Sequence, residues 1–148
     1  MKRNNALADS DSIEQSYLAL LHFLALAKRR LFEIGHEYGL TGMQTLTLFM
    51  LTMPCPMHSL KKIFNCDASN ITGLIDGLEQ KGLVSRYEDK ADRRIKMVKL
   101  KAKGRRLRKT LLERLTQSHN HLLAKLSPAE LRTFVTLLEK LTTGEESV

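Results

Sequence analysis

A tight turn between two short helices is the feature that most constrains the fold of this chain. The segment "LKKIF" has the apolar spacing of a short helix that Ser59 can cap, and "NCD" follows it as a turn. Asp67 can cap the next helix, "ASNITGLIDGLEQK", and Gly82 can end that helix in the left-handed conformation. A short helix, a tight turn and a second, capped helix together predict a helix-turn-helix.

Two short strands are predicted directly after this unit. The segments "LVSRYE" and "IKMVKL" have the composition and length of strands, and the polar segment "DKADRR" joins them as a hairpin loop. A hairpin in this position forms a wing beside the second helix. We therefore predict a mainly α fold with a small β-hairpin wing, in which a winged helix-turn-helix lobe covers about residues 41–101.

This lobe is predicted to begin with one more helix. The box "TGMQ" places Thr41 at an N-cap position with Gln44 reaching back to it, and the helix continues through "TLTLFMLTM". Pro54 and Pro56 follow and end the helix.

Amphipathic helices are predicted on both sides of the lobe, over about residues 10–38 and 105–143. Gly35 and Gly39 close the first segment, and "SPAE" starts the last helix with Ser127 as its N-cap. The apolar face of the first helix comprises Ile13, Tyr17, Leu20, Leu21, Leu24, Leu31 and Ile34. The helix after the hairpin carries Leu107, Leu111, Leu112, Leu115, Leu122, Leu123 and Leu126 on one side.

The terminal helices carry more apolar surface than one winged lobe can cover. A symmetric dimer buries the same patch on both copies, so we expect a homodimer. The 148 residues are otherwise enough for a single domain with its own core.

Positive charge is concentrated in one part of the chain. The net charge is +8 and the pI is about 9.7. The segment from Arg86 to Lys109 holds half of all Lys and Arg residues and only three acids, Glu88, Asp89 and Asp92. Such a cluster favours a polyanionic partner, with nucleic acid before an anionic membrane.

The apolar run near the N-terminus does not predict a secretory signal or a membrane span. Asp9, Asp11 and Glu14 interrupt it, and it is too short for a bilayer. The two cysteines form no C-x-x-C pair, which fits a reducing cytosol. We therefore expect a cytoplasmic protein without a membrane partner.

The helix "ASNITGLIDGLEQK" presents a face suited to DNA bases. Its apolar residues fall on one side and are expected in the core: Ile71, Leu74, Ile75 and Leu78. The other side is small and polar, so that the backbone can enter a major groove, where Ser, Thr and Asn hydrogen-bond to base edges. We predict DNA contacts from Ser69, Asn70, Thr72 and Gly73.

Cations beside this helix are predicted to bind phosphates. Lys61 and Lys62 precede the turn, Lys81 ends the helix, and Arg86 lies in the first strand. Contacts of this kind position a protein on DNA without reading its sequence.

The wing tip carries Arg93 and Arg94, which we predict to reach the minor groove. Asp92 lies two residues before Arg94, and in a strand-like wing this spacing puts both side chains on one face. Our hypothesis is that Asp92 accepts from the Arg94 guanidinium and aims it at the groove. The alternative is an exposed ion pair with no part in DNA binding.

The segment "DASNITGLIDGLEQKGLVSRYEDKADRRIKMVKL" and the glycine that follows it resemble the MarR family of bacterial winged helix-turn-helix regulators. The family pattern is a Ser/Thr-rich helix, then Leu-Glu-x-x-Gly-Leu-[Val/Ile]-x-Arg, then a loop with Asp-x-Arg, then a strand that ends before a Gly. The matching positions here are Leu78-Glu79, Gly82-Leu83-Val84, Arg86, Asp92, Arg94 and Gly104.

The resemblance implies a homodimer whose N- and C-terminal helices interlock, with one recognition helix and one wing per subunit. The implied partner is double-stranded DNA with a pseudo-palindromic operator, and the usual role is repression relieved by a small ligand, an oxidant or a metal. The Asp-x-Arg pair aims the arginine in this family as well. Two residues depart from the pattern: Gly77 replaces a frequent basic residue, and Lys101 replaces a strand-ending Thr.

Other kinds of site were weighed against this one. Cys66 lies in the turn beside a helix N-terminus, where a thiol can be prone to oxidation, although a small buried hydrophobe is the other interpretation. A zinc site needs three or four converging ligands, and the histidines are scattered, so we predict no metal. The five are His22, His36, His58, His119 and His121.

Catalytic motifs are missing from the sequence. It has no G-x-S-x-G, no phosphate-cradling Gly loop and no His-Glu-x-x-His, so we predict no catalytic residues, no cofactor and no enzyme. The alternatives to a DNA-binding repressor are a winged-helix protein-interaction module, a redox- or metal-responsive sensor of the same fold, and a basic RNA-binding or architectural protein. We assign no effector pocket.

Overall fold

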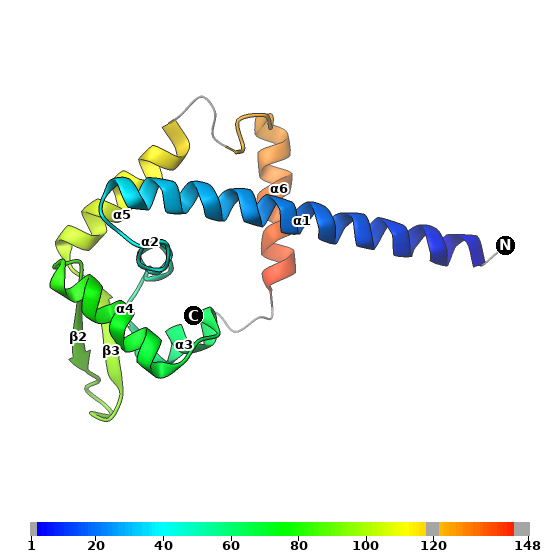
Figure 1. Ribbon diagram of the computed structural model, residues 1–148. Helices are drawn as coiled ribbons and strands as arrows, with labels where there is room; N and C mark the ends of the chain where they lie inside the picture. The colour runs from blue at the N-terminus through cyan, green and yellow to red at the C-terminus, as the bar shows by residue number, and fades with distance from the viewer. Residues whose placement is uncertain (1–2, 118–121, 144–148) are drawn as a thin grey trace.

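The computed structural model describes residues 3–117 and 122–143 as helices around a small sheet (Figure 1). Within these residues the fold is mainly α with a β-hairpin wing, as predicted. The elements in chain order are α1 (Arg3–Glu37), α2 (Gly42–Met50), β1 (Cys55–Pro56), α3 (Met57–Phe64), α4 (Ala68–Gln80), β2 (Val84–Glu88), β3 (Lys96–Leu100), α5 (Ala102–Gln117) and α6 (Pro128–Thr142).

The helix-turn-helix consists of α3 and α4. Asn65 ends α3 in the left-handed conformation with φ 45°, and Asp67 stands at the N-cap of α4, although its side chain makes no capping hydrogen bond. The prediction that Ser59 caps α3 was wrong, because the helix begins earlier, with Pro56 at its N-cap. Proline suits this position because it has the required φ and loses no needed N–H.

The junction between α4 and the hairpin depends on Gly82. Its φ of 71° is in the left-handed region, and its N–H donates to the Glu79 carbonyl at 2.8 Å. The Leu83 N–H donates to the Leu78 carbonyl at 3.0 Å, and both leucines are buried. This is the helix end that the sequence predicted, and it turns the chain directly into β2.

The sheet has three antiparallel strands in the order β1-β3-β2. The hairpin pairs Val84 with Leu100 at its base and Glu88 with Lys96 near its tip. Strand β1 was not predicted, because Pro54 and Pro56 indicated only the end of a helix. A strand of two residues at a sheet edge tolerates proline, since the missing N–H faces away from the ladder.

The core of the lobe lies between the C-terminal end of α1, α2, α3, α4, the sheet and α5. The capping boxes at Thr41 and Ser127 both form as predicted and start α2 and α6. Every apolar residue predicted on the inner face of α4 packs into this core, with Leu74 half-buried and the others buried. The buried core residues are Ile34, Leu40, Leu48, Leu51, Cys55, Leu60, Ile71, Ile75, Leu78, Leu83, Val84, Val98, Leu100 and Leu111.

The first helix is longer than predicted and its end differs. Gly35 lies inside α1, where an added Cβ would overlap the Thr45 side chain, so this glycine permits close packing of α1 on α2. The segment closes at Gly39, which has φ 68°. The prediction that both glycines close the helix is therefore right only for Gly39.

The helix after the hairpin is shorter than predicted. In the described residues α5 ends at Gln117, and the residues from Leu122 to Lys125 form a turn before Ser127 caps α6. The capping box requires an extended residue at 127, which prevents one continuous helix. The three last predicted leucines, at 122, 123 and 126, are therefore not on α5, and His119 and His121 lie outside the described residues.

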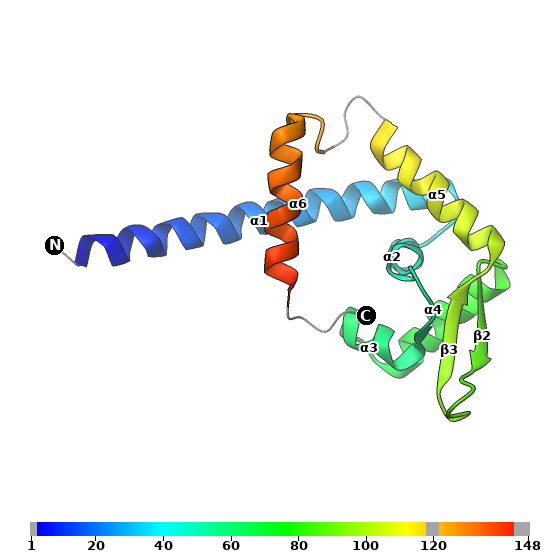
Figure 2. The same cartoon turned by 180° about the vertical axis from the view of Figure 1, so that it is seen from behind.

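The N-terminal half of α1 extends away from the lobe, and α6 crosses α1 (Figures 1 and 2). They meet where the rings of Phe23 and Phe134 lie edge to face, with centroids 5.8 Å apart. None of the described residues of α6 is buried. The exposed apolar residues of the two helices are Ile13, Tyr17, Leu18, Leu20, Leu21, Leu24, Val135, Leu137, Leu138 and Leu141.

Candidate nucleic-acid interface

The outward face of α4 is polar, small and open. Ser69, Asn70, Thr72 and Gly73 are all exposed, and an added Cβ at Gly73 would meet nothing within 4 Å. The Thr72 hydroxyl donates to the Ala68 carbonyl at 3.0 Å and keeps its own acceptor free for another group. The face can therefore approach a surface closely and hydrogen-bond with it.

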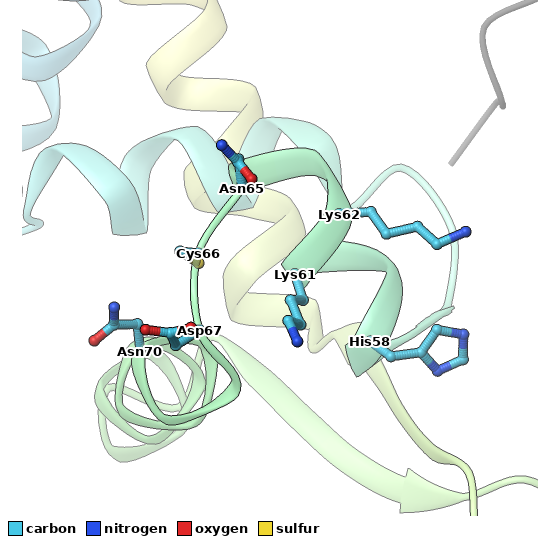
Figure 3. A pocket seen from close by; sticks show the side chains of 7 residues that line it. All are labelled: His58, Lys61, Lys62, Asn65, Cys66, Asp67 and Asn70. Carbon is cyan, nitrogen blue, oxygen red and sulfur yellow. The ribbon is translucent and has the colours of Figure 1, made fainter.

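A concave surface of about 670 Å³ lies in front of the helix-turn-helix (Figure 3). Lys61 and Lys62 reach it from α3, and Asn70 reaches it from the first turn of α4. In Figure 3 the Lys61 side chain lies on the side of α3 that faces α4, whereas Lys62 points away from α4, so Lys61 is the cation placed to bind a phosphate near this helix N-terminus. The residues that line it are His58, Lys61, Lys62, Asn65, Cys66, Asp67 and Asn70.

The two cysteines are both free thiols. Cys66 is half-buried in the turn and packs against the core, as a small hydrophobe would. Burial raises the pKa of the Cys55 thiol. Among the described residues, no three His, Cys, Asp or Glu side chains are grouped so that they could hold a metal ion.

Arg86 is held inside the lobe by two carboxylates of α4. Its Nε donates to Glu79 Oε2 at 3.0 Å, its Nη2 donates to the same oxygen at 2.7 Å and also to Asp76, and its backbone N–H donates to Glu79 Oε1 at 3.2 Å. These bonds hold the pKa of Glu79 below its usual value. Arg86 therefore joins β2 to α4, and its predicted phosphate contact would compete with these bonds.

The carboxylates that hold Arg86 were not recognised from the sequence. Asp76 and Glu79 are three residues apart and so project from the same side of α4. The chain reverses at Gly82, which brings Arg86 back to that side. This spacing around a helix-ending glycine is the signal that could have revealed the ion pairs.

The predicted contact between Asp92 and Arg94 is present at the wing tip. Arg94 Nε donates to Asp92 Oδ1 at 3.0 Å and Nη2 donates to Oδ2 at 2.9 Å. The Arg94 side chain is 91% exposed, so the guanidinium is bonded to Asp92 on one side and open to solvent on the other. The bonds lower the pKa of Asp92 and raise that of Arg94.

The reason given for this contact was wrong, because the two residues lie in a turn and not on one face of a strand. The Arg94 backbone N–H donates to Asp92 Oδ1 at 3.0 Å, and the Ile95 N–H donates to the Asp92 carbonyl at 2.9 Å. A further bond at 3.0 Å, from the Asp89 N–H to the Ile95 carbonyl, closes the loop. Asp92 thus orders both the turn and the arginine, while Arg93 is exposed beside them.

A hollow of about 320 Å³ joins the wing to α4. Thr72 lines it from the helix, Arg94 lines it from the wing, and Lys61 lines it from α3. The fold thus brings together three of the predicted site residues that are distant in sequence. Lys81 lies at the other end of α4, where its carbonyl accepts from Lys103 Nζ at 2.8 Å.

Gly77 has a packing role. An added Cβ would lie 2.6 Å from Nε2 of Gln44, a side chain that is 9% exposed. Oε1 of the same Gln44 accepts from the Thr41 N–H at 3.1 Å, which fixes the amide in place. A larger residue at 77 would have to displace this amide, so the buried glutamine accounts for the absence of a basic side chain there.

Comparison with known proteins places these features in a family. The model of the MarR family matches residues 41–96, which is most of the winged lobe. A probable transcriptional regulator from Pseudomonas aeruginosa is 32% identical; the match covers 80% of this chain and 92% of that one, with a TM-score of 0.58. Apo MarR from E. coli is 27% identical over 83% and 93% of the two chains, with a TM-score of 0.66.

The chain belongs to the MarR family of transcriptional regulators. A mutant of E. coli MarR in complex with operator DNA is 28% identical, covering 83% of this chain and 91% of that one, with a TM-score of 0.62. The MarR-type fold accounts for the winged helix-turn-helix lobe. Among the described residues, no helix combines the length and apolar character needed to cross a membrane.

The link between Arg86 and Glu79 predicts a pH-dependent contribution to stability. Because the folded-state pKa of Glu79 is lowered, the contribution is present above the unfolded pKa of about 4.3 and is lost as the pH falls through the folded pKa. At pH 7, Arg86→Gln should lower the free energy of unfolding by about 1 kcal/mol, because the groups are only partly buried.

Urea unfolding of the parent and the variant at pH 7 and at pH 3 measures this contribution. The difference between them should shrink at the lower pH. Lys96→Gln is a matched control, since it breaks the exposed 2.7 Å ion pair with Glu88 and should cost less than about 0.5 kcal/mol. A difference for Arg86→Gln that does not depend on pH would contradict the assigned role.

Proposed function

We propose that this MarR-family regulator is a homodimeric repressor that binds a pseudo-palindromic DNA operator and is released by a small ligand or another signal. The observation that carries the proposal is the shared surface of α4 and the wing, where Thr72, Arg94 and Lys61 line one hollow. A helix face with small polar groups fits a major groove, and an aimed arginine fits the adjacent minor groove. The operator complex of E. coli MarR supports the same partner for this chain.

The proposed base contacts come from Ser69, Asn70 and Thr72, and Gly73 leaves room for the backbone to approach the DNA. The proposed contacts with the DNA backbone come from the surrounding cations. Lys61, Lys62 and Lys81 are exposed around α4, and Arg93 lies at the wing tip. Arg86 is a weaker candidate for a phosphate contact, because its guanidinium is already paired. These contacts would position the lobe while α4 reads the sequence.

The proposed domain organisation separates dimerisation from DNA binding. Helices α1, α5 and α6 would form the dimer, and the lobe over about residues 41–101 would bind DNA. The exposed apolar residues of α1 and α6 support this division, because a monomer would leave them in water. A dimer seated on an operator excludes other proteins from that DNA, and a ligand that shifts the two lobes would release it.

Selection of bound fragments from random DNA, followed by footprinting, tests the proposed function. The selected sites should contain two symmetric half-sites with centres roughly 10 bp apart, as two-fold symmetry requires. Affinity should fall steeply with salt, by about 0.9 log units per log unit of salt for each phosphate contacted. A selected site without internal symmetry, or a flat salt response, would count against the proposal.

The reading face of α4 is tested by replacing Ser69, Asn70 and Thr72 together with Ala. The ratio of operator binding to non-specific binding should fall about tenfold or more, because base-edge hydrogen bonds are lost while phosphate contacts remain. Thr133→Ala with Thr136→Ala is the control, since both hydroxyls are exposed on α6 and bond to their own helix as Thr72 does. Preference that survives the triple change would show that another element reads the DNA.

If Asp92 aims Arg94, removing Asp92 should weaken operator binding, whereas simple electrostatics predicts that removing an acid near DNA strengthens it. Arg94→Ala should weaken operator binding roughly 10–100-fold, because a groove contact is lost. Asp92→Ala should weaken it about 3–10-fold, because the free arginine must then be ordered on binding. Operator titrations of folded variants at one salt concentration provide the measurement.

Glu88→Ala is the matched control for Asp92→Ala. It removes an acid from the same wing without touching Arg94, since Glu88 pairs with Lys96 at 2.7 Å. This variant should bind DNA as well as the parent or better. If Asp92→Ala behaves in the same way as Glu88→Ala, Asp92 is only a surface charge.

The dimer interface is tested on α1. Tyr17 and Leu21 are 64% and 59% exposed one turn apart, so Tyr17→Asp with Leu21→Asp should put charges into the interface and dissociate or aggregate the protein. Gln15→Asp adds a charge at another exposed position of the same helix and should leave the dimer intact. Sedimentation that finds the parent to be a folded monomer would reject the proposed assembly.

A further inference from the structure

A second concentration of positive charge lies away from the wing tip. Between Asp92 and Glu113 the chain has no acidic residue. Seven cations of this stretch occupy the end of β3 and the first half of α5, and we call them the α5 cationic surface. They are Lys99, Lys101, Lys103, Arg105, Arg106, Arg108 and Lys109, all exposed except Arg108, which is half-buried.

The α5 cationic surface is separate from the contact made by the wing. Leu100 pairs with Val84 at the base of the hairpin, whereas Asp92 and Arg94 form the turn at its other end. A strand of five residues spans about 17 Å. The surface is therefore about that far from Arg94, so the wing contact does not account for it.

Local physical chemistry opposes this placement of charge. The Lys101 carbonyl accepts from the Arg105 N–H at 3.0 Å, so Lys101 stands at the N-cap of α5, where its side chain has no oxygen to offer. The N-terminus of a helix already carries partial positive charge, and α5 has no acid in its first turn. An anion from outside would supply the missing interaction.

The partners within the chain do not neutralise these cations. Lys103 Nζ donates to the Lys81 carbonyl and Arg105 Nη1 donates to the Leu100 carbonyl, both at 2.8 Å, but a carbonyl carries no net charge. Lys109 lies 3.9 Å from the exposed Glu113 carboxylate. Lys101 is near enough to the Glu79 carboxylate to help lower its pKa, but that carboxylate is bonded to Arg86. Among the described residues, no carboxylate forms an ion pair with Lys101 or Arg106.

The position of α5 in the molecule indicates which anion can reach it. In both views α5 begins at the side of the lobe that faces away from α6 and from the N-terminal half of α1 (Figures 1 and 2). In a dimer that pairs through α1 and α6, the two cationic surfaces would lie at the outer ends. In the proposed complex, DNA that continues beyond the operator would pass these ends.

We propose that the α5 cationic surface binds the phosphates of duplex DNA that flanks the operator, without reading its sequence. The flanking duplex would bend toward the lobe, and the added phosphate contacts would offset the energy of bending. This inference rests on the proposed operator binding, but it concerns DNA outside the operator.

The experiment compares two DNA fragments and one triple variant of the full chain. One fragment contains only the footprinted operator, and the other extends it by about 15 bp on each side, about one and a half turns. The variant is Lys101→Gln, Arg106→Gln and Lys109→Gln, which leaves the bonds of Lys103 and Arg105 intact. Affinity is measured for both fragments over a range of salt concentrations.

The parent should bind the extended fragment more tightly than the operator fragment, and the variant should lose this gain. The variant should lose three phosphate contacts per subunit on the extended fragment. The slope of log affinity against log salt should therefore be smaller than that of the parent by roughly 2.7 per subunit, which corresponds to about a 40-fold smaller loss of affinity between 50 and 200 mM salt. On the operator fragment the parent and the variant should have the same affinity.

A second triple variant, Lys125→Gln, Arg132→Gln and Lys140→Gln, is the control. It changes three exposed cations elsewhere and, like the first variant, takes the net charge from +8 to +5.

Equal binding of both fragments by the parent would overturn the proposal, as would an equal loss from the two triple variants. An effect seen only with a separate duplex added in trans, or only with RNA or anionic vesicles, would also overturn it by assigning the surface to another partner. Failure of the proposed function would appear differently, as an operator fragment bound no better than a scrambled one.

Discussion

The wing is held against α4 by the guanidinium of Arg86, and the proposed DNA surface depends on that attachment. Hydrogen bonds from one side chain reach Asp76 and Glu79 on the helix, while the backbone of the same residue pairs with Val98 in the sheet. Arg86 thus helps to fix the position of the hairpin, whose turn carries Arg94, relative to the proposed reading face of α4. The left-handed Gly82 makes this possible, because it reverses the chain within a few residues and returns the strand to the helix.

The positive charge of the segment from Arg86 to Lys109 is concentrated at two places, the tip and the base of the hairpin. At the tip, Asp92 opposes part of the charge and gives Arg94 a direction. At the base, the acid-free stretch leaves the first half of α5 strongly cationic and without an N-cap side chain. An acid beside an arginine indicates positioning, whereas cations without acids indicate a surface that attracts phosphates. Cations of one short segment therefore have two different proposed roles: Arg94 is positioned by an acid, and the cations of α5 attract phosphates.

Local patterns made much of the fold predictable. The capping boxes at Thr41 and Ser127, the glycine at 82 and the polar hairpin loop each act over a few residues, and each appears in the structure as predicted. Two predictions that failed depended on distant partners. Strand β1 exists because β3 offers it an edge, and Gly35 lies inside α1 because Thr45 packs on it.

The sequence by itself determined the order of the helices and the hairpin and the polar outward face of α4, because spacing along the chain defines both. It also predicted the pairing of Asp92 with Arg94, although a turn, and not the spacing of a strand, brings these two residues together. Only the tertiary structure decided that Arg86 is held by α4, that Gln44 occupies the space beside Gly77, and that Thr72 and Arg94 line one hollow. Each of these joins residues from different elements. Their distances depend on how helices and strands pack in three dimensions, and neither periodicity nor composition specifies that packing.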